Sequence, residues 1–244
     1  MTRSYAFVVP AWNEERCLPA TLAAIQSAAE AVAIEYEVII ADDASTDRTA
    51  ELARAGGARV IACDNRQIAA TRNAGAREAK ADILIFVDAD THPSAATLQG
   101  VVDALDRGAT YGGADVTWNT RPPFLLRVLL RATLNYYKRT KLASGAFLFC
   151  TRESFEKVGG FDEDLYAAEE YYFSRKLKHE GTYAWITSQV ITSGRKLRTY
   201  STWELLREGC TLMLRGKRGL KRSDLDLWYA ERRADPLAED GEHA

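Results

Sequence analysis

The sequence lacks the features that mark several large classes of protein. Its four cysteines lie far apart, without the spacing of a zinc or redox site or the density of a disulfide framework. We therefore expect free thiols in or near the core. No uncharged stretch approaches the roughly 20 residues that span a bilayer, and the N-terminal apolar run is too short for a signal peptide. These absences favour a cytoplasmic protein.

Charge and glycine patterns exclude further classes. The formal net charge is −2, so the chain as a whole is not expected to bind nucleic acid. Neither a Gly-x-Gly-x-x-Gly fingerprint nor a P-loop occurs. What is present is 244 residues with 47% hydrophobic content, which is enough for one large core or two closely packed halves.

Short apolar, β-branched runs alternate with helical patterns in the first half of the chain. We expect strands at 5–9, 38–41, 59–62 and 83–87, each followed by a helix, the later three helices at about 46–55, 68–79 and 94–105. This order predicts a parallel sheet with helices on both faces. In the less regular second half we expect helices at 124–137, 152–158 and 169–178, and strands at 145–150 and 183–191.

The most informative pair of residues is Asp88 and Asp90, at the end of the strongest expected strand. Side chains two apart in an extended segment point the same way, so both carboxylates can converge at the carboxyl end of the strand. Neighbouring carboxylates raise each other's pKa unless a cation joins them. Mg²⁺ and Mn²⁺ are commonly shared between carboxylates and substrate phosphates. The alternative is an acidic strand end that caps the next helix.

Two more polar loops follow expected strands. Asp42 and Asp43 follow the second strand, where an acidic residue often accepts hydrogen bonds from a base or ribose. Ser45 or Asp47 could then cap the next helix. The first strand leads into the polar segment 10–15. Since ligands of parallel sheets bind outside the carboxyl ends of the strands, we expect these loops to line one crevice with Asp88 and Asp90.

Five motifs, in this order and spacing, resemble the glycosyltransferases of family 2, which have the GT-A fold. The resemblance extends over roughly residues 5–195. The motifs are Val-Pro-Ala-Trp-Asn-Glu-Glu (9–15), Asp-Asp-Ala-Ser-Thr-Asp-Arg-Thr (42–49), Ala-Thr-Arg-Asn-Ala-Gly (70–75), Asp-Ala-Asp (88–90), and Gly-Gly-Phe-Asp-Glu (159–163) followed by Glu169-Glu170. The resemblance implies an α/β protein with a Rossmann-like, mostly parallel sheet flanked by helices, and a smaller acceptor-side half.

We accordingly divide the chain into one GT-A domain and an extension. The domain is expected at 1–200, with a nucleotide-sugar-binding half at 1–115 and an acceptor half at 116–200. Residues 201–244 are expected to form a basic helical arm and an acidic tail. Nine Lys and Arg residues lie between 195 and 222, against two Glu.

The resemblance also implies a nucleotide-sugar donor, a divalent cation (Mn²⁺ or Mg²⁺) and roles for single residues. Asp90 would hold the metal that bridges the diphosphate, with Asp88 beside it toward the ribose. Such a cation stabilises charge on the departing nucleoside diphosphate. The other donor-binding residues implied are Pro10, Ala11, Trp12 and Glu14 lining the nucleotide pocket, Asp43 on the base, Arg72 near the base or diphosphate, and Ala89 within the Asp-Ala-Asp motif.

The resemblance further implies inverting transfer, which needs a base for the proton of an acceptor hydroxyl. The family usually has Glu-Asp at this point, whereas this chain has Glu169-Glu170, so Glu170 occupies the position of the base. Because neighbours on a helix do not face the same way, we expect one of the two in the site and the other outside it. The alternative is a solvated helix start favoured by the helix dipole.

Other features leave alternatives open. His92 follows Asp90 by two and could be a metal ligand or a polar residue before Pro93. Arg195 could approach the diphosphate or be the first charge of the basic arm. The absence of Gln-x-x-Arg-Trp argues against a processive synthase.

The acceptor is expected to be a glycan or a lipid-linked molecule. The expected helix at 124–137 carries Phe124, Leu125, Val128, Leu129 and Ala132 on one stripe, with Arg127 and Arg131. With the basic arm, it could contact an anionic membrane surface peripherally, or it could pack on the sheet. Two rival functions are a nucleotidyltransferase and a non-catalytic relative that binds sugar nucleotides.

Overall fold

The computed structural model describes residues 3–215 together with 225 and 235. Within them lies one eight-stranded sheet in the order β3-β2-β1-β4-β7-β6-β8-β5. The strands are β1 (Ser4–Ala11), β2 (Glu35–Asp43), β3 (Arg59–Cys63), β4 (Ile83–Val87), β5 (Thr91–His92), β6 (Tyr111–Trp118), β7 (Phe147–Thr151) and β8 (Tyr183–Thr192). The first four strands in the spatial order are parallel, as are β6 and β8, whereas β7 is antiparallel between β4 and β6.

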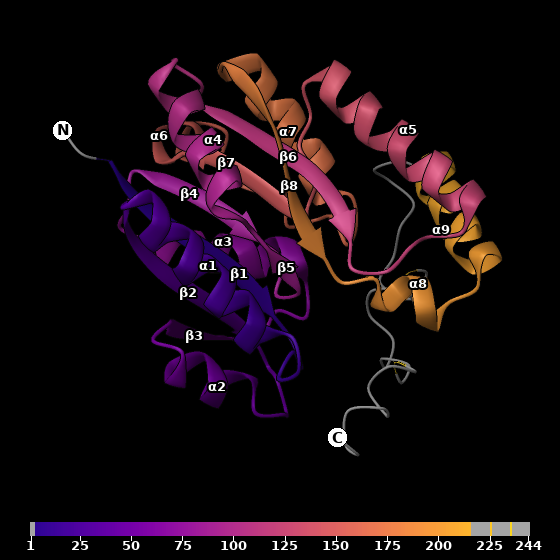
Figure 1. Cartoon of the computed structure of the whole chain (residues 1–244), viewed down its shortest axis with the longest axis horizontal. Coiled ribbons are helices and arrows are strands. Elements are labelled where there is room, and N and C mark those ends of the chain that lie inside the picture. The colour runs from indigo at the N-terminus through magenta and orange to yellow at the C-terminus, as the bar shows by residue number, and fades with distance from the viewer. Residues whose placement is uncertain (1–2, 216–224, 226–234, 236–244) are drawn as a thin grey trace.

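Helices cover both faces of this sheet (Figure 1). They are α1 (Leu18–Val32), α2 (Thr49–Ala55), α3 (Ile68–Glu78), α4 (Ala95–Asp106), α5 (Phe124–Thr140), α6 (Arg152–Lys157), α7 (Glu169–Glu180), α8 (Arg195–Thr199) and α9 (Thr202–Arg215). The expected α/β fold with a mostly parallel sheet is confirmed. No helix in the described part of the chain is long and apolar enough to cross a membrane.

Alternation along the buried strands divides the core in two. On β1, Phe7 and Val9 point into a core shared with α1 and α4, whereas Ala6 and Val8 point into a core shared with α3, α6 and α7. Successive side chains of a strand face opposite sides, so a strand that is apolar at every position needs a cover on both. The continuous apolar runs of the sequence therefore predicted this layering.

Close packing explains Gly75, the last residue of the 70–75 motif. A Cβ on Gly75 would lie 2.5 Å from Cγ1 of Val8. Glycine at this position lets α3 lie directly on β1. Gly75 thus sets the distance between α3 and β1, the two elements that carry Arg72 and the loop at residues 12–15.

Strand β6 was not predicted from the sequence, and its glycines, which are also required by close packing, are the reason. Its segment begins Tyr-Gly-Gly-Ala-Asp, and glycine weakens a strand prediction. In the fold, a Cβ on Gly112 would lie 2.0 Å from the carbonyl oxygen of Ala184 on β8. The glycine is required by close approach of the neighbouring strand, which no local pattern shows.

The sequence also did not predict the short strand β5 or the short helix α8. Further differences lie at the ends of elements. Helix α2 begins at Thr49 rather than near residue 46, and α5 continues to Thr140. Cys150 is buried and Cys17 and Cys63 are half-buried, and these three cysteines form no disulfide. The acidic tail proposed from the sequence lies outside the described residues, except for Asp235.

Candidate active site

The loops after β1 and β2 are held together by hydrogen bonds. The backbone N–H of Glu14 donates to Oγ1 of Thr49 (2.8 Å), and that of Asn13 donates to Oγ of Ser45 (2.9 Å). The N–H of Thr46 donates in return to Oδ1 of Asn13 (2.8 Å). Two of the five sequence motifs therefore interlock.

The predicted cap of α2 is partly present. The residue preceding α2 is Arg48, which makes no side-chain cap bond. Asp47, just before it, accepts the N–H of Thr49 (2.9 Å) and the N–H of Glu15 (3.1 Å). Its carboxylate thus serves the first turn of the helix and the neighbouring loop at once.

Asp43 lies at the end of β2 and is buried. Its Oδ1 accepts the N–H groups of Asn65 (2.7 Å) and Arg66 (2.9 Å), and its Oδ2 accepts from the N–H of Gln67 (3.1 Å) and the hydroxyl of Thr71 (2.9 Å). These four donors match the roughly four lone-pair sites of a carboxylate. Asp43 therefore holds the loop that begins α3.

Asp42, the residue before it, differs. Within the described residues, its buried Oδ1 has no hydrogen-bond partner, and a buried acceptor without a donor is costly. The sequence could not distinguish these two adjacent aspartates. The structure separates them by the donors that surround each.

Trp12 of the first loop packs against the same segment. The guanidinium carbon of Arg66 lies 4.1 Å from the centre of the Trp12 ring, a cation–π geometry. Pro10 and Trp12 are half-buried, and Ala11 is buried. The loop after β1 is therefore fixed on both sides, by the β2 loop and by Arg66.

Asp88 and Asp90 follow β4, but not in the extended geometry expected from the sequence. The N–H of Thr91 donates to the carbonyl of Asp88 (3.0 Å), so the segment is a turn. The carboxylates consequently have different partners, and the expectation of two parallel side chains is wrong. The side chain of Ala89 packs in the core instead.

The Asp88 carboxylate contacts Arg72. This arginine comes from α3, is 2% exposed, and donates from Nη2 to Oδ1 of Asp88 (2.8 Å) and to the carbonyl of Gly145 (3.1 Å). Its Nη1 donates to Oε1 of Glu169 (2.5 Å). One buried guanidinium therefore links the Asp-Ala-Asp turn to the start of α7.

Glu169 and Glu170 both lie beside Arg72. Glu169 is buried in the ion pair, whereas Glu170 is half-buried and raises the pKa of Arg72 by its charge. A Cβ on Gly145 would lie within 3.6 Å of both Glu170 and Arg72. The expectation that one of the two glutamates lies outside the site is wrong, because α7 begins directly over Arg72.

Burial raises the pKa of Glu170 well above its ordinary value, and the charge of Glu169 adds to this effect. Asp88 acts in the same direction and Arg72 against it. A general base works best when its pKa lies near the operating pH, and the raised pKa of Glu170 is closer to that range than the pKa of an ordinary carboxylate. The two glutamates thus differ in their contacts: Glu169 is an ion-pair partner of Arg72, and Glu170 is a carboxyl with a raised pKa.

The lead-in to α7 is anchored on α3. The side-chain amide of Asn73 donates to the carbonyl of Phe161 (2.9 Å) and accepts the N–H of the same residue (2.9 Å). Gln67 donates to the carbonyls of Glu163 (2.7 Å) and Leu165 (2.6 Å). The 70–75 and 159–163 motifs therefore join, and their junction fixes the position of Glu170.

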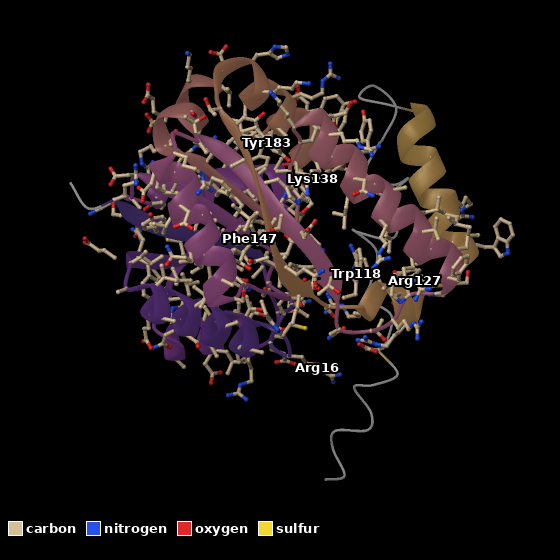
Figure 2. All side chains as sticks on the ribbon, turned by 45° about the horizontal axis from the view of Figure 1, so that its top comes forward. Arg16, Trp118, Arg127, Lys138, Phe147 and Tyr183 are labelled. Atoms are coloured by element: carbon tan, nitrogen blue, oxygen red, sulfur yellow. The ribbon has the colours of Figure 1, made fainter. Side chains whose placement is uncertain are left out.

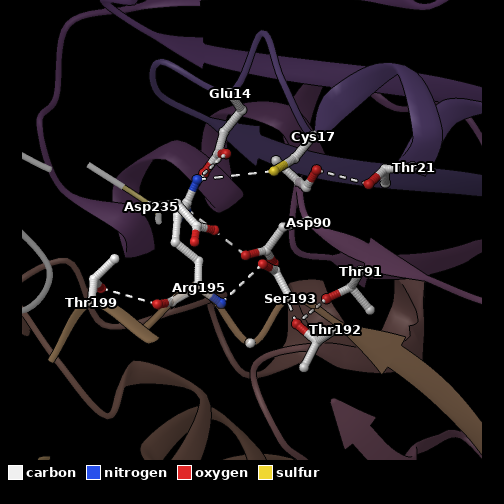
Figure 3. Close-up of polar contacts among 12 residues, drawn as sticks. Glu14, Cys17, Thr21, Asp90, Thr91, Thr192, Ser193, Arg195, Thr199 and Asp235 are labelled. Atoms are coloured by element: carbon white, nitrogen blue, oxygen red, sulfur yellow. Dashed lines mark hydrogen bonds and ion pairs between the residues drawn. The ribbon is translucent and has the colours of Figure 1, made fainter. Parts of the chain in front are cut away.

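The Asp90 carboxylate lies in an acidic environment next to Glu14 and Arg195 (Figure 3). Burial, with Asp88 and Glu14, raises the pKa of Asp90 to about 6, although Arg195 opposes the shift. Nη2 of Arg195 is 3.9 Å from Oδ2 of Asp90, and both nitrogens of its fork donate to Glu14 (3.1 Å each). Arg195, from the start of α8, therefore lies in the site.

These carboxylates fit a hard divalent cation. Their oxygens are the ligands that Mg²⁺ and Mn²⁺ take, and Asp90 is close enough to the charges of Asp88 and Glu14 to feel both. In the described part of the chain, no three His, Cys, Asp or Glu side chains gather as a complete metal cage. A cation shared with the phosphates of a substrate does not need one.

Sequence reasoning missed the contact that Asp235 makes with this region. Its carboxylate accepts from Nε (2.9 Å) and Nη2 (2.5 Å) of Arg198, one turn after Arg195. No signal in the sequence pairs two residues 37 positions apart.

His92, in β5, is half-buried, and burial lowers its pKa.

Several known proteins are similar to this chain in sequence. An uncharacterized glycosyltransferase of Mycobacterium bovis is 36% identical over 115 residues, which are 47% of this chain and 48% of that protein. An undecaprenyl-phosphate 4-deoxy-4-formamido-L-arabinose transferase of Edwardsiella ictaluri is 31% identical over 41% of this chain and 33% of its own length. The chain thus spans about half, or less, of these curated relatives.

Solved structures show the same fold. The mannosyltransferase PcManGT from Pyrobaculum calidifontis, in complex with GDP-Man and Mn²⁺, has a TM-score of 0.65 at 21% identity, covering 98% of this chain and 72% of that one. S. aureus TarS 1-349 in complex with UDP-GlcNAc has a TM-score of 0.62 at 19% identity, covering 95% and 71%. Residues 6–159 match the family model described as Glycosyl transferase family 2, and the chain belongs to that family.

Proposed function

We propose that the protein transfers a sugar from a nucleoside-diphosphate sugar to an acceptor hydroxyl or lipid phosphate, with inversion and without processive elongation. The observation that carries this proposal is the junction at Arg72, which binds Asp88 and Glu169 and lies close to Glu170. The donor-binding turn at Asp88 and the proposed base Glu170 would then lie on either side of the buried guanidinium of Arg72. Family membership and the GDP-Man and UDP-GlcNAc complexes of the structural neighbours support the donor class.

The donor would lie along the carboxyl ends of β1, β2 and β4. Trp12 and the loop after β1 would line its nucleotide, with Pro10, Ala11 and Glu14. Since the lone pairs of Asp43 are filled, we assign the base-facing hydrogen bond to Asp42. The ion pair with Asp88 and Glu169 makes Arg72 a positioning residue for both sides of the site.

Asp90, with Asp88, would hold a Mn²⁺ or Mg²⁺ ion. When bound, such an ion stabilises negative charge on the diphosphate as it leaves. Arg195 is placed to contribute a second positive charge, because it is 3.9 Å from Asp90. The Mn²⁺ complex of the Pyrobaculum neighbour supports a divalent cation.

For a hydroxyl acceptor, Glu170 takes the proton while the acceptor oxygen bonds to the anomeric carbon. The bond from that carbon to the diphosphate breaks, and its electron pair goes to the diphosphate oxygen. A phosphate monoester is already ionised near neutral pH, so a lipid phosphate acceptor needs no base. The two acceptor classes therefore predict different behaviour of Glu170.

A panel of nucleotide sugars with Mn²⁺ or Mg²⁺ tests the proposal. Wild type should release nucleoside diphosphate on hydrolysis or transfer, and Asp90→Ala should not. Asp103→Ala, an exposed residue of α4, is the matched control. Release of pyrophosphate from a nucleoside triphosphate and a sugar phosphate would instead indicate a nucleotidyltransferase. Donor binding without turnover under any condition would indicate the non-catalytic alternative.

A further inference from the structure

Helix α5 exposes large apolar side chains along one side. Phe124 is 72% exposed, Leu125 54%, Val128 48% and Leu129 41%. We call these four residues the outer face of α5. Buried and half-buried residues, Leu126, Leu130, Leu134 and Tyr137, form a separate narrow stripe on the same helix. At about 100° per residue, the two sets lie on different sides of the helix.

Exposed apolar residues that recur over two helical turns form a contiguous surface. Single exposed leucines are ordinary in folded proteins, whereas a cluster marks an interaction site. Trp203, 81% exposed, adds an aromatic side chain at the start of α9. Figures 1 and 2 both show α9 beside α5, on the side of the molecule away from α1 and α2.

The charge of α5 is of one sign. Its 17 residues include Arg127, Arg131, Lys138 and Arg139 and no Asp or Glu. On a helical projection, the first three follow one edge of the outer face. The Arg127 guanidinium lies 5.5 Å from the centre of the Phe124 ring, and Figure 2 shows Arg127 and Lys138 on this helix. A basic edge beside an apolar face is the pattern of helices that lie in a membrane interface.

We propose that the outer face of α5 inserts into the surface of an anionic lipid bilayer, with the helix parallel to the membrane plane. The apolar residues enter the acyl boundary, and Arg131 and Lys138 contact lipid phosphates. A bilayer that contains anionic lipids offers acyl chains to the apolar side chains and phosphate groups to the basic residues beside them. A second copy of the chain would place two sets of like charges together and is disfavoured.

The same helix also reaches the proposed active site. The ring of Tyr137, in the last turn of α5, lies 6.4 Å from the ring of Tyr171, the residue after Glu170. Burial raises the pKa of Tyr137, and the charge of Glu170 adds to this effect. A bilayer-bound α5 would therefore turn the Glu170 side of the site toward the membrane, where a lipid-linked acceptor resides. This consequence rests on the proposed function, but the lipid contact itself does not.

Vesicle flotation tests the contact, with phosphatidylcholine alone and with added phosphatidylglycerol. We expect binding to the anionic vesicles that weakens at high salt. Phe124→Ser with Leu125→Ser should lower partitioning roughly tenfold or more, and Arg131→Ser with Lys138→Ser roughly tenfold. Arg54→Ser with Arg107→Ser, which removes two exposed charges from α2 and the end of α4, should change it less than twofold.

Melting temperatures of all variants establish that they fold. Glu170→Gln should bind vesicles as wild type does, which separates this proposal from the catalytic one. The proposal is overturned if wild type binds neither vesicle, or if the α5 variants bind as wild type does. A concentration-dependent dimer that Phe124→Ser with Leu125→Ser abolishes would assign the face to a second copy and would also overturn it.

Discussion

The donor-side edge of the sheet and helix α5 are built on opposite principles. At the edge, most polar groups are paired within the molecule, as the four donors to Asp43 and the three acceptors of Arg72 show, and Oδ1 of Asp42 is an exception among the described residues. On α5, large apolar groups and like charges face outward. An internally satisfied region can hold reactive groups in fixed positions. A region that exposes apolar and basic groups acquires its function from what it contacts.

The largest expected effect comes from the donor edge. Asp90→Ala should lower kcat/KM by roughly 1000-fold, because a bound cation supplies several kcal/mol of charge stabilisation. The measurement is donor turnover at saturating Mn²⁺. Asp103→Ala should retain wild-type activity. Retention of activity by Asp90→Ala would remove this aspartate from the metal site.

The two glutamates at the start of α7 should respond differently to the same substitution. With a hydroxyl acceptor, Glu170→Gln should reduce kcat by roughly 100-fold or more and leave the melting temperature near that of wild type. Glu169→Gln should lower stability by about 1–3 kcal/mol, because a buried charge of Arg72 loses its ionised partner. Turnover and thermal unfolding are measured on both. An unchanged rate for Glu170→Gln with a hydroxyl acceptor would reject Glu170 as the base.

The pH profile should show the raised pKa of Glu170. A base must be deprotonated, so kcat/KM should increase with pH through a pKa above the ordinary carboxylate range. Glu170→Gln should flatten this limb. Stability should change in the opposite sense: a carboxyl whose pKa is raised by folding binds more protons when folded, so its contribution falls as pH rises between the two values. A limb unchanged in Glu170→Gln would assign it to another group.

The smallest expected effect lies on α5. Phe124→Ala should change the free energy of unfolding by no more than about 0.5 kcal/mol, because the ring is 72% exposed. Phe173→Ala should cost about 3–5 kcal/mol, since this ring is fully buried and stacks on Phe161 at 4.1 Å. Chemical denaturation compares the two. A large loss for Phe124→Ala would mean that the outer face is part of the core.

The strongest sequence signals were predictive because they are local. The run 83–87 is apolar at every position and forms β4 with every residue buried. Motif 42–49 begins with the last two residues of β2, and motif 70–75 lies within α3. Glycines hid β6, because the packing that requires Gly112 comes from β8, some 70 residues later.

The contacts of the candidate site residues could not be predicted from the sequence. The sequence placed Asp43 on a ligand and Arg72 near the donor. The structure instead gives Asp43 four internal donors and leaves Oδ1 of Asp42 without one in the described residues. Which of two adjacent aspartates is satisfied depends on the path of residues 65–67, and no local pattern encodes that path.

By itself, the sequence determined the family, the layering and the edge of the sheet where the site lies, because hydrophobic period and motif order are properties of neighbouring residues. Only the tertiary structure decided that Arg72 joins Asp88 to Glu169, that Glu170 lies beside them with a raised pKa, and that the outer face of α5 stays exposed. Each of these facts depends on burial and on contacts between distant segments. Burial and such contacts set the strength of charges and the exposure of apolar groups, so these properties exist only once the chain is folded.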